Sequence, residues 1–359
     1  MAKSNQKKQT KRTATIDGEP RRFLERLLSV PSPVGSETAV RAVIADYARA
    51  FADNVQIDTM GNLTAVINPD ARPRVMLVGH SDEIGLLVNY IEDDGYLRVA
   101  ALGGVDISTY LGYPVDILTR DGTVRGVIGS RPIHLQTAAE RDAAPTIKTI
   151  WIDIGATSKD DASKRVRIGD PAVVSTGFNV LRDNICVARG FDNRAGVWVA
   201  FEALRQLKAS GSKACVYAVA SAQEEIGARG AIPAAYRLDC DYGVAIDVTF
   251  ATDYPSENTT EQGDVCIGGG PVIARGPVLD DAFADQLLQT AAKHRIPYQT
   301  EATSRSTGTD ADYLQISRGG MRTALVSVPV RYMHTPVETL NIGDMAFAAE
   351  LLAAAISNI

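Results

Sequence analysis

The fold is decided by one stretch, Ala214-Cys215-Val216-Tyr217-Ala218-Val219-Ala220-Ser221-Ala222-Gln223-Glu224-Glu225-Ile226-Gly227. Its first seven residues form an apolar run, which is typical of a strand that is buried on both faces. Gly227 breaks the pattern, so the pair Glu224 and Glu225 is predicted to lie where a buried strand ends and a loop begins. In open α/β sheets, that edge is where ligands bind.

Two adjacent carboxylates repel each other, and this repulsion costs free energy unless a cation or a shared proton compensates. Taken alone, a Glu-Glu pair is most often part of a solvated loop. The rest of the chain therefore decides whether Glu224 and Glu225 mark a functional site.

Composition narrows the class of protein. A chain of 359 residues exceeds one comfortable hydrophobic core, so two domains are expected. Hydrophobic residues make up 45% and charged residues 22%, as in soluble globular proteins. The net charge of −6 argues against nucleic acid as a partner. No apolar stretch reaches the roughly 18 residues of a membrane span, so no membrane association is expected.

The cysteines and the N-terminus bear on location. Four scattered cysteines without a CxxC motif favour buried thiols in a reducing compartment, so we expect a cytoplasmic protein. Residues 1–14 are basic and are predicted to form a disordered tail. This segment lacks the apolar core of a secretory signal.

Helix and strand patterns alternate on both sides of the quoted stretch. Three further apolar runs are predicted as buried strands, at 74–79, 242–246 and 322–328. Helical periodicity covers 195–207, 279–294 and 344–356. We therefore predict an α/β fold, an α/β/α sandwich with a mixed central sheet, built from residues 15–84 and 176–359.

Between these two segments the pattern changes. Residues 85–175 contain short β-type runs separated by turns such as Arg120-Asp121-Gly122-Thr123, and no long helix. We predict a small all-β domain inserted into the α/β domain. The polar segment 138–146 is predicted to be a mobile loop.

Residues of metal-ligand type follow the predicted strands, and we list them as His80, Asp82, Asp192, Glu224, Glu225, Asp247 and His334. Parallel strands bring their carboxyl ends to one edge of a sheet, so these side chains are expected to meet there. Two histidines and several carboxylates, without cysteine, suit a pair of divalent ions. Such pairs activate water for hydrolysis.

Each of these residues also has a structural interpretation. His80 and His334 could be core or capping histidines, Asp192 could cap a helix, and Asp247 could cap a turn. The specific signal is the combination of residue types at successive strand ends.

Five motifs carry a resemblance to a known family: His80-Ser81-Asp82-Glu83-Ile84-Gly85, Phe191-Asp192-Asn193-Arg194-Ala195-Gly196, Gln223-Glu224-Glu225-Ile226-Gly227-Ala228-Arg229-Gly230-Ala231, Ala245-Ile246-Asp247-Val248 and His334-Thr335-Pro336-Val337-Glu338. In order and spacing they resemble the M42 family of metalloaminopeptidases, which includes glutamyl- and leucyl-type tetrahedral aminopeptidases. The resemblance runs from about residue 18 to the C-terminus.

The resemblance implies five metal ligands. His80 and Asp247 would bind one ion, Glu225 and His334 the other, and Asp192 would bridge the two. The cofactors would be two divalent ions per subunit, with zinc expected and cobalt or manganese as alternatives.

The resemblance also implies two catalytic roles. Glu224 would be the general base and later the general acid, and Asp82 would orient His80 through its second ring nitrogen. A cis peptide bond is expected between Asp192 and Asn193. The substrates would be short peptides, shortened from their N-termini.

The implied assembly is a large homo-oligomer. Residues 85–175 would be a β-barrel-like dimerisation domain, and dimers would build a dodecamer. His134 in the insertion and His294 at a helix end are interpreted as surface or interface residues.

Other function classes remain open from the sequence. A metal-dependent deacylase or carboxypeptidase could use a related metal core. An endoglucanase-type glycoside hydrolase would use two carboxylates but would not need two histidine ligands. A non-catalytic scaffold would be expected to lack a ligand or the base, and none is missing.

Overall fold

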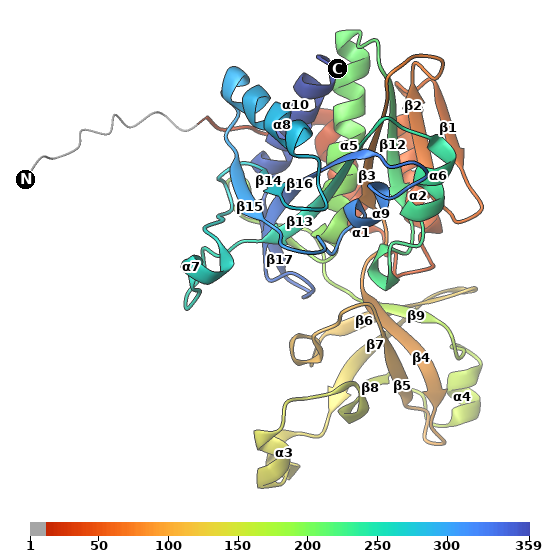
Figure 1. Ribbon diagram of the computed structural model, residues 1–359. Coiled ribbons are helices and arrows are strands. Elements are labelled where there is room, and N and C mark those ends of the chain that lie inside the picture. The colour runs from red at the N-terminus through yellow and green to blue at the C-terminus, as the bar shows by residue number, and fades with distance from the viewer. Residues whose placement is uncertain (1–11) are drawn as a thin grey trace, which may run out of the picture.

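The strands predicted as buried lie side by side in one mixed sheet of eleven strands (Figure 1). The computed structural model describes residues 12–359. The strands of this sheet are β1 Asn54–Ile57, β2 Leu63–Ile67, β3 Arg74–His80, β10 Asn179–Arg182, β11 Ile185–Ala188, β12 Cys215–Ser221, β13 Tyr242–Phe250, β14 Val272–Arg275, β15 Gln299–Ala302, β16 Arg322–Arg331 and β17 Glu338–Asn341.

The middle of this sheet is parallel, and its borders are antiparallel. The order is β1-β2-β12-β3-β13-β16-β17-β11-β10, and β12, β3, β13 and β16 run parallel to one another. Strand β14 pairs with β16 and β15. The carboxyl ends of the four parallel strands therefore meet at one edge, as the sequence predicts.

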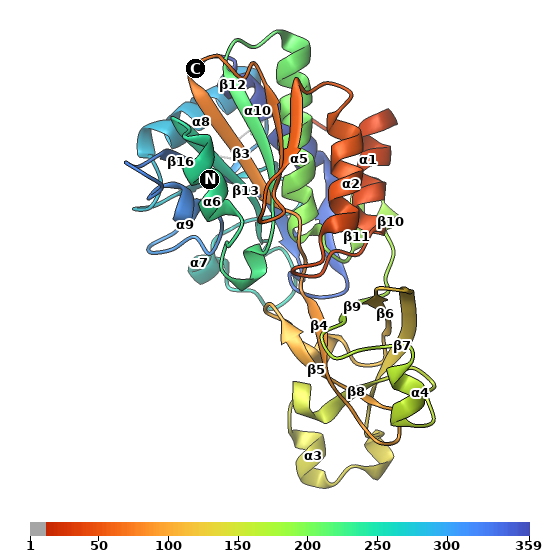
Figure 2. The same ribbon diagram turned by 90° about the vertical axis from the view of Figure 1, so that its right-hand side faces the viewer.

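Helices cover both faces of the sheet (Figure 2). One face carries α1 Gly18–Ser29, α2 Thr38–Ala48, α5 Phe191–Ser210, α8 Asp281–His294 and α10 Ile342–Ile356. The other carries the shorter α6 Ala231–Leu238 and α9 Ala311–Leu314. A further short helix, α7 Thr259–Gln262, lies in a connecting segment. The predicted α/β/α sandwich with a mixed sheet is confirmed.

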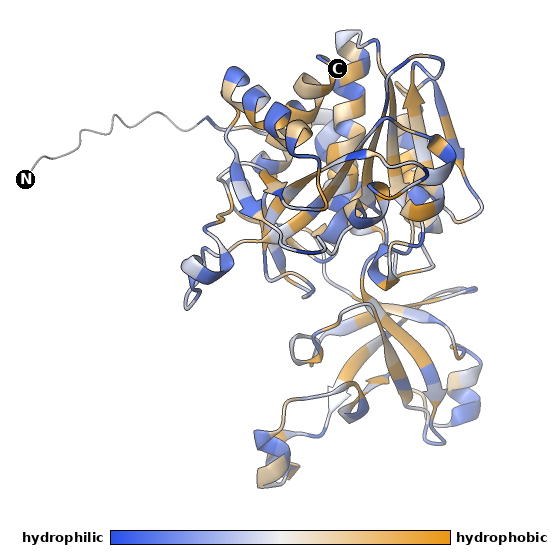
Figure 3. Cartoon of the chain, in the orientation of Figure 1, coloured by the Kyte–Doolittle hydropathy of each residue, from blue (hydrophilic) through white to orange (hydrophobic). Residues whose placement is uncertain are grey.

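Strand β3 shows how the apolar pattern produces this sandwich. Val75 and Leu77 pack into the core beneath α5, whereas Met76 and Val78 pack into the core beneath α6. Alternate side chains of a strand point to opposite faces, so an uninterrupted apolar run fills two cores. The central strands are accordingly mainly hydrophobic in Figure 3, whereas the helices carry both hydrophilic and hydrophobic segments.

Helix α5 approaches the end of β3 closely. A Cβ atom added at Gly79 would lie 2.6 Å from the carbonyl carbon of Gly196 and 2.7 Å from the backbone nitrogen of Val197. Only glycine at position 79 allows the backbones of β3 and α5 to lie this close together. This close approach brings the start of α5 next to the strand ends.

The predicted insertion forms a closed six-stranded barrel beneath the α/β domain (Figure 1). Its strands are β4 Gly85–Ile91, β5 Leu97–Leu102, β6 Pro114–Thr119, β7 Gly122–Ser130, β8 Ile150–Asp153 and β9 Pro171–Val174, closing in the order β4-β5-β8-β7-β6-β9. Inward-facing residues such as Val115 and Ile117 alternate along β6 and fill a separate core.

Two short helices belong to the barrel, α3 Ala138–Asp142 and α4 Lys159–Ser163. The prediction of a loop throughout 138–146 is wrong at its start. The hydroxyl of Thr137 accepts the backbone N–H of Glu140, and the carboxylate of Glu140 accepts the N–H of Thr137. This capping box stabilises one helical turn.

Residues 1–11, most of the predicted basic tail, lie outside the described residues. Arg12 forms an ion pair with Glu350 of α10 at 2.7 Å and lies over the ring of Phe347. Across residues 12–359, no helix is both long and apolar enough to cross a bilayer, and no disulfide joins the cysteines.

Candidate metal centre

The predicted ligands come from five segments that meet at the carboxyl edge of the sheet. His80 is the last residue of β3, and its register partner Ser221 ends β12. Glu224 and Glu225 follow in a short 3-10 turn, Glu224–Ile226. Strand β13 continues past Asp247, but its pairing with β3 ends at Ala245, which leaves Asp247 open to the site.

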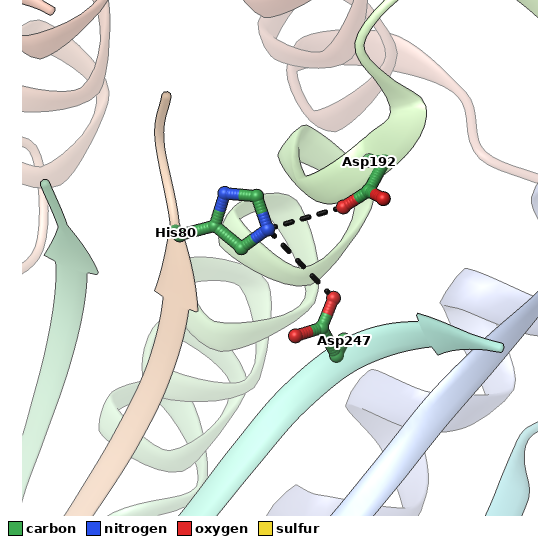
Figure 4. Close-up of side chains that lie close together, drawn as sticks. All are labelled: His80, Asp192 and Asp247. Atoms are coloured by element: carbon green, nitrogen blue, oxygen red, sulfur yellow. Dashed lines mark hydrogen bonds and ion pairs between the residues drawn. The ribbon is translucent and has the colours of Figure 1, made fainter. Parts of the chain in front are cut away.

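Three side chains, which form the first ligand group, surround one possible ion position (Figure 4). The Nε2 atom of His80 lies 3.1 Å from Oδ1 of Asp192 and 3.9 Å from Oδ1 of Asp247. All three residues are buried. One imidazole nitrogen and two carboxylate oxygens are a suitable donor set for a divalent ion.

Asp192 also belongs to a second group of three, with Glu225 and His334. The Nε2 atom of His334 lies 3.2 Å from Oδ2 of Asp192 and 3.5 Å from Oε2 of Glu225. Asp192 thus presents one oxygen to each histidine, which is the arrangement that a bridging carboxylate requires. The peptide bond between Asp192 and Asn193 is cis, as expected.

Glu224 lies beside the first group. Its Oε2 atom is 3.8 Å from Nε2 of His80. Burial raises the pKa of Glu224 to about 7, although the nearby His80 opposes this rise. A carboxylate with such a pKa can both accept and return a proton near neutral pH.

Asp82 has a contact that the sequence did not predict. Its two carboxylate oxygens accept the backbone N–H groups of Glu224 and Glu225, at 3.0 and 3.1 Å. The Nδ1 atom of His80 lies 3.2 Å from the backbone oxygen of Asp82 and 3.5 Å from its carboxylate. Asp82 therefore connects His80 to the turn that carries both glutamates.

Glu338 is a buried residue to which the sequence assigned no role. Its carboxylate accepts the backbone N–H of Asp192 and that of His334, each at 3.0 Å. It thereby fixes two segments that carry ligands of the second group. Its place in the motif His334–Glu338 was visible, but its contacts depend on the folded chain.

The barrel also reaches the centre. The Nδ1 atom of His334 donates to the backbone oxygen of Gly104, which follows β5, at 2.9 Å. With the proton on Nδ1, Nε2 is free to act as a ligand. A backbone carbonyl carries no sequence signal, so this contact could not be predicted.

The residues present fit divalent ions. The Oε1 atom of Glu225 is buried and has no hydrogen-bond partner among the described residues. Burial raises the pKa of Glu225 to about 8 and raises that of Asp247 well above its usual value. Burial also raises the pKa of Asp192, but hydrogen bonds from His334 and His80 outweigh it and keep that pKa low. Bound cations would offset the free-energy cost of burying these negatively charged carboxylates.

The centre lies in a cleft of about 550 Å³. The rest of its lining comes from strands β13, β15 and β16, the segment 302–309 and Met333. His134, in the 3-10 turn Ile133–Leu135 of the barrel, and His294, at the end of α8, are exposed and belong to neither ligand group.

Known proteins are similar to this chain over most of its length. Residues 61–351 match the family model described as M42 glutamyl aminopeptidase. The chain is 36% identical over 329 residues to the lysyl aminopeptidase of Pyrococcus furiosus, covering 90% of this chain and 92% of that protein.

Solved structures are similar along nearly the whole chain. A TET aminopeptidase from a marine sediment archaeon of the Thaumarchaeota superposes with a TM-score of 0.90 at 30% identity, covering 95% of this chain and 96% of that one. The TET1 peptidase of Pyrococcus horikoshii is described as assembling into a tetrahedron or a large octahedral shell. It superposes with a TM-score of 0.84 at 31% identity, covering 93% of this chain and 98% of that one.

A Thermotoga maritima structure described as an endoglucanase gives a TM-score of 0.73 at 26% identity, covering 93% of this chain and 98% of that one. The family match extends over most of the chain and includes every residue of the two ligand groups. The chain therefore belongs to the M42 family of aminopeptidases, metal-dependent peptide hydrolases.

Proposed function

We propose that this protein is a two-metal aminopeptidase that removes the N-terminal residue from short peptides. The observation that carries the proposal is the sharing of Asp192 between two groups of ligands. His80 and Asp247 would complete one ion site, and Glu225 and His334 the other. Zinc is the expected metal, and cobalt or manganese also suits these ligands.

When bound, two such ions supply Lewis acidity that activates water and stabilises charge on the scissile carbonyl. The chain's own contribution to proton transfer is Glu224. An oxygen of its ionised carboxylate would accept a proton from the attacking water and pass it to the leaving amine. Asp82 holds the backbone of Glu224, which fixes the distance between this base and His80.

The geometry disfavours glycoside hydrolysis. That reaction needs two carboxyl groups on opposite sides of the scissile bond, about 5 to 9.5 Å apart. The carboxylates here instead converge on two histidines within the groups described above. A glycosidase would keep its activity in a chelator, whereas the proposed peptidase would lose it.

We also propose that the barrel is a dimerisation domain and that dimers assemble further, up to a dodecamer. Support comes from apolar side chains exposed on the barrel, among them Val127, Ile133 and Leu135 at 48%, 61% and 63%. A cytoplasmic location is proposed from the buried thiols of Cys186, Cys215 and Cys240.

The proposal is tested by metal analysis and by activity on three kinds of substrate. These are aminoacyl-amides, N-acetylated aminoacyl-amides, and peptides with a blocked N-terminus and a free C-terminus. We expect two ions per chain and hydrolysis only where the α-amino group is free. Preferred cleavage of the acetylated compounds would indicate a deacylase. Release of C-terminal residues would indicate a carboxypeptidase.

A further inference from the structure

The cleft beside the ligand groups contains an acidic side chain for which the proposed mechanism has no role. Glu301 lies on β15 and lines the cleft that also holds His80, Asp247 and His334. It belongs to neither ligand group. Its position on a strand, rather than in the loop that follows, gives it a defined place in the cleft wall.

The neighbours of Glu301 that shift its pKa are hydroxyl groups and not cations. The hydroxyl of Thr249 donates to Oε2 of Glu301 at 2.6 Å. Burial raises the pKa of Glu301, and the hydroxyls of Thr249 and Ser327 lower it, with no contribution from a Lys, Arg or His among residues 12–359. A partly buried carboxylate without a counter-ion is a favourable place for an incoming cation.

Glu301 also lies at a suitable distance from the centre. Thr249 follows Asp247 by two residues on β13, so both side chains lie on the same face of the strand. Two residues of a strand span roughly 6.6 Å. The four-carbon stem of a lysine whose α-carbon is held beside the ligand groups can cover this separation.

We propose that Glu301 determines specificity by binding the cationic side chain of the peptide's N-terminal residue. Peptides that begin with Lys or Arg are then preferred over those that begin with apolar or acidic residues. This inference rests on the proposed aminopeptidase function, because it assumes that the substrate's N-terminal residue occupies this cleft.

Arg305 lines the same cleft and would favour an acidic N-terminal residue instead. It is exposed and lies in the loop after β15, whereas Glu301 is partly buried and fixed by Thr249. Solvent screens the charge of an exposed group more strongly than that of a buried one. Glu301 is therefore the stronger determinant of the two.

The test compares kcat/KM for amides of lysine, norleucine and glutamate in the metal-loaded protein. Norleucine keeps an unbranched apolar stem but lacks the charge. We expect lysine to be preferred, and Glu301→Gln to lower kcat/KM for lysine by about 10- to 100-fold, as for a lost charged hydrogen bond. The value for norleucine should change little, and metal content should stay at the wild-type level.

The matched control is Glu261→Gln on the exposed helix α7, which should keep the ratio of lysine to norleucine. The inference is wrong if the wild-type protein prefers glutamate or norleucine. It is also wrong if Glu301→Gln keeps the wild-type ratio of lysine to norleucine.

A binding measurement separates this inference from the proposed function. Calorimetry with lysinamide and norleucinamide on the metal-loaded protein needs no turnover. If no amide is hydrolysed, the aminopeptidase proposal fails. Tighter binding of lysinamide that is lost in Glu301→Gln would still support the role of Glu301, and equal affinities would contradict it.

Discussion

At the residue scale, Glu224 and Glu225 are held where burial makes their negative charge unfavourable. Burial raises the pKa of Glu224 to about 7 and that of Glu225 to about 8, from an ordinary value of 4.5. Between pH 4.5 and these raised values, the two carboxyl groups bind more protons in the folded, metal-free protein than in the unfolded chain. Stability that is fully present below about pH 4.5 is therefore lost as pH rises toward 8.

This gives a prediction for the metal-free protein. Its unfolding midpoint in urea should fall as pH rises from 5 to 8, and added divalent metal should reverse much of the fall. The double variant Glu224→Gln and Glu225→Gln should show a weaker dependence on pH in the metal-free state. A wild-type midpoint that is constant or rises over this range would contradict the prediction.

The sequence predicted that His80, Asp192, Glu225, Asp247 and His334 would lie together, and these five side chains do converge. It could do so because parallel strands end at a common edge. Contacts through the backbone are of another kind. The hydrogen bond from His334 to Gly104 and the two N–H groups held by Glu338 depend on loop paths that residue types do not specify.

At the element scale, the site depends on how closely α5 approaches β3. This separation requires the absence of a side chain at Gly79, where an added Cβ would lie 2.6 Å from the backbone of Gly196. The apolar run of β3 predicted a buried strand. The close approach could not be predicted, because it depends on two segments that are far apart in the sequence.

We predict that Gly79→Ala lowers the free energy of unfolding by about 1–3 kcal/mol, because overpacking forces the helix and strand apart. The matched control is Gly319→Ala, where an added Cβ meets no atom within 4 Å. Urea denaturation measures both variants. Equal stability of Gly79→Ala and the control would show that the helix and strand can separate at no cost.

The barrel illustrates both the success and the limit of sequence patterns. Short alternating runs and turns predicted an all-β insertion, and the strands from Gly85 to Val174 close into a barrel. The sequence analysis did not predict helix α3, because this helix is stabilised by the two reciprocal hydrogen bonds between Thr137 and Glu140. Five residues are too few to show helical periodicity.

At the scale of the whole molecule, the barrel serves two purposes in the proposed account. Its Gly104 holds His334, and its exposed Ile133 and Leu135 offer an apolar surface for another copy. Such exposed apolar groups are favourable when they are buried in an interface.

We predict that the wild-type protein is a homo-oligomer at micromolar concentration and that Ile133→Glu with Leu135→Glu lowers its mass. The conservative pair Ile133→Val and Leu135→Met should keep the wild-type mass. Multi-angle light scattering gives the masses, and metal content verifies that each variant is folded. A monomeric wild-type protein would contradict the proposed dimerisation domain.

We propose that two ions share Asp192, with Glu225 as a ligand and Glu224 as the base. The most direct measurement is metal content and turnover for Glu224→Gln and Glu225→Gln beside the wild-type protein. We predict two ions per chain in the wild type and in Glu224→Gln, with turnover in Glu224→Gln lower by about 10²–10⁴. Glu225→Gln should hold one ion less. Loss of metal from Glu224→Gln, with two ions retained in Glu225→Gln, would contradict the assignment.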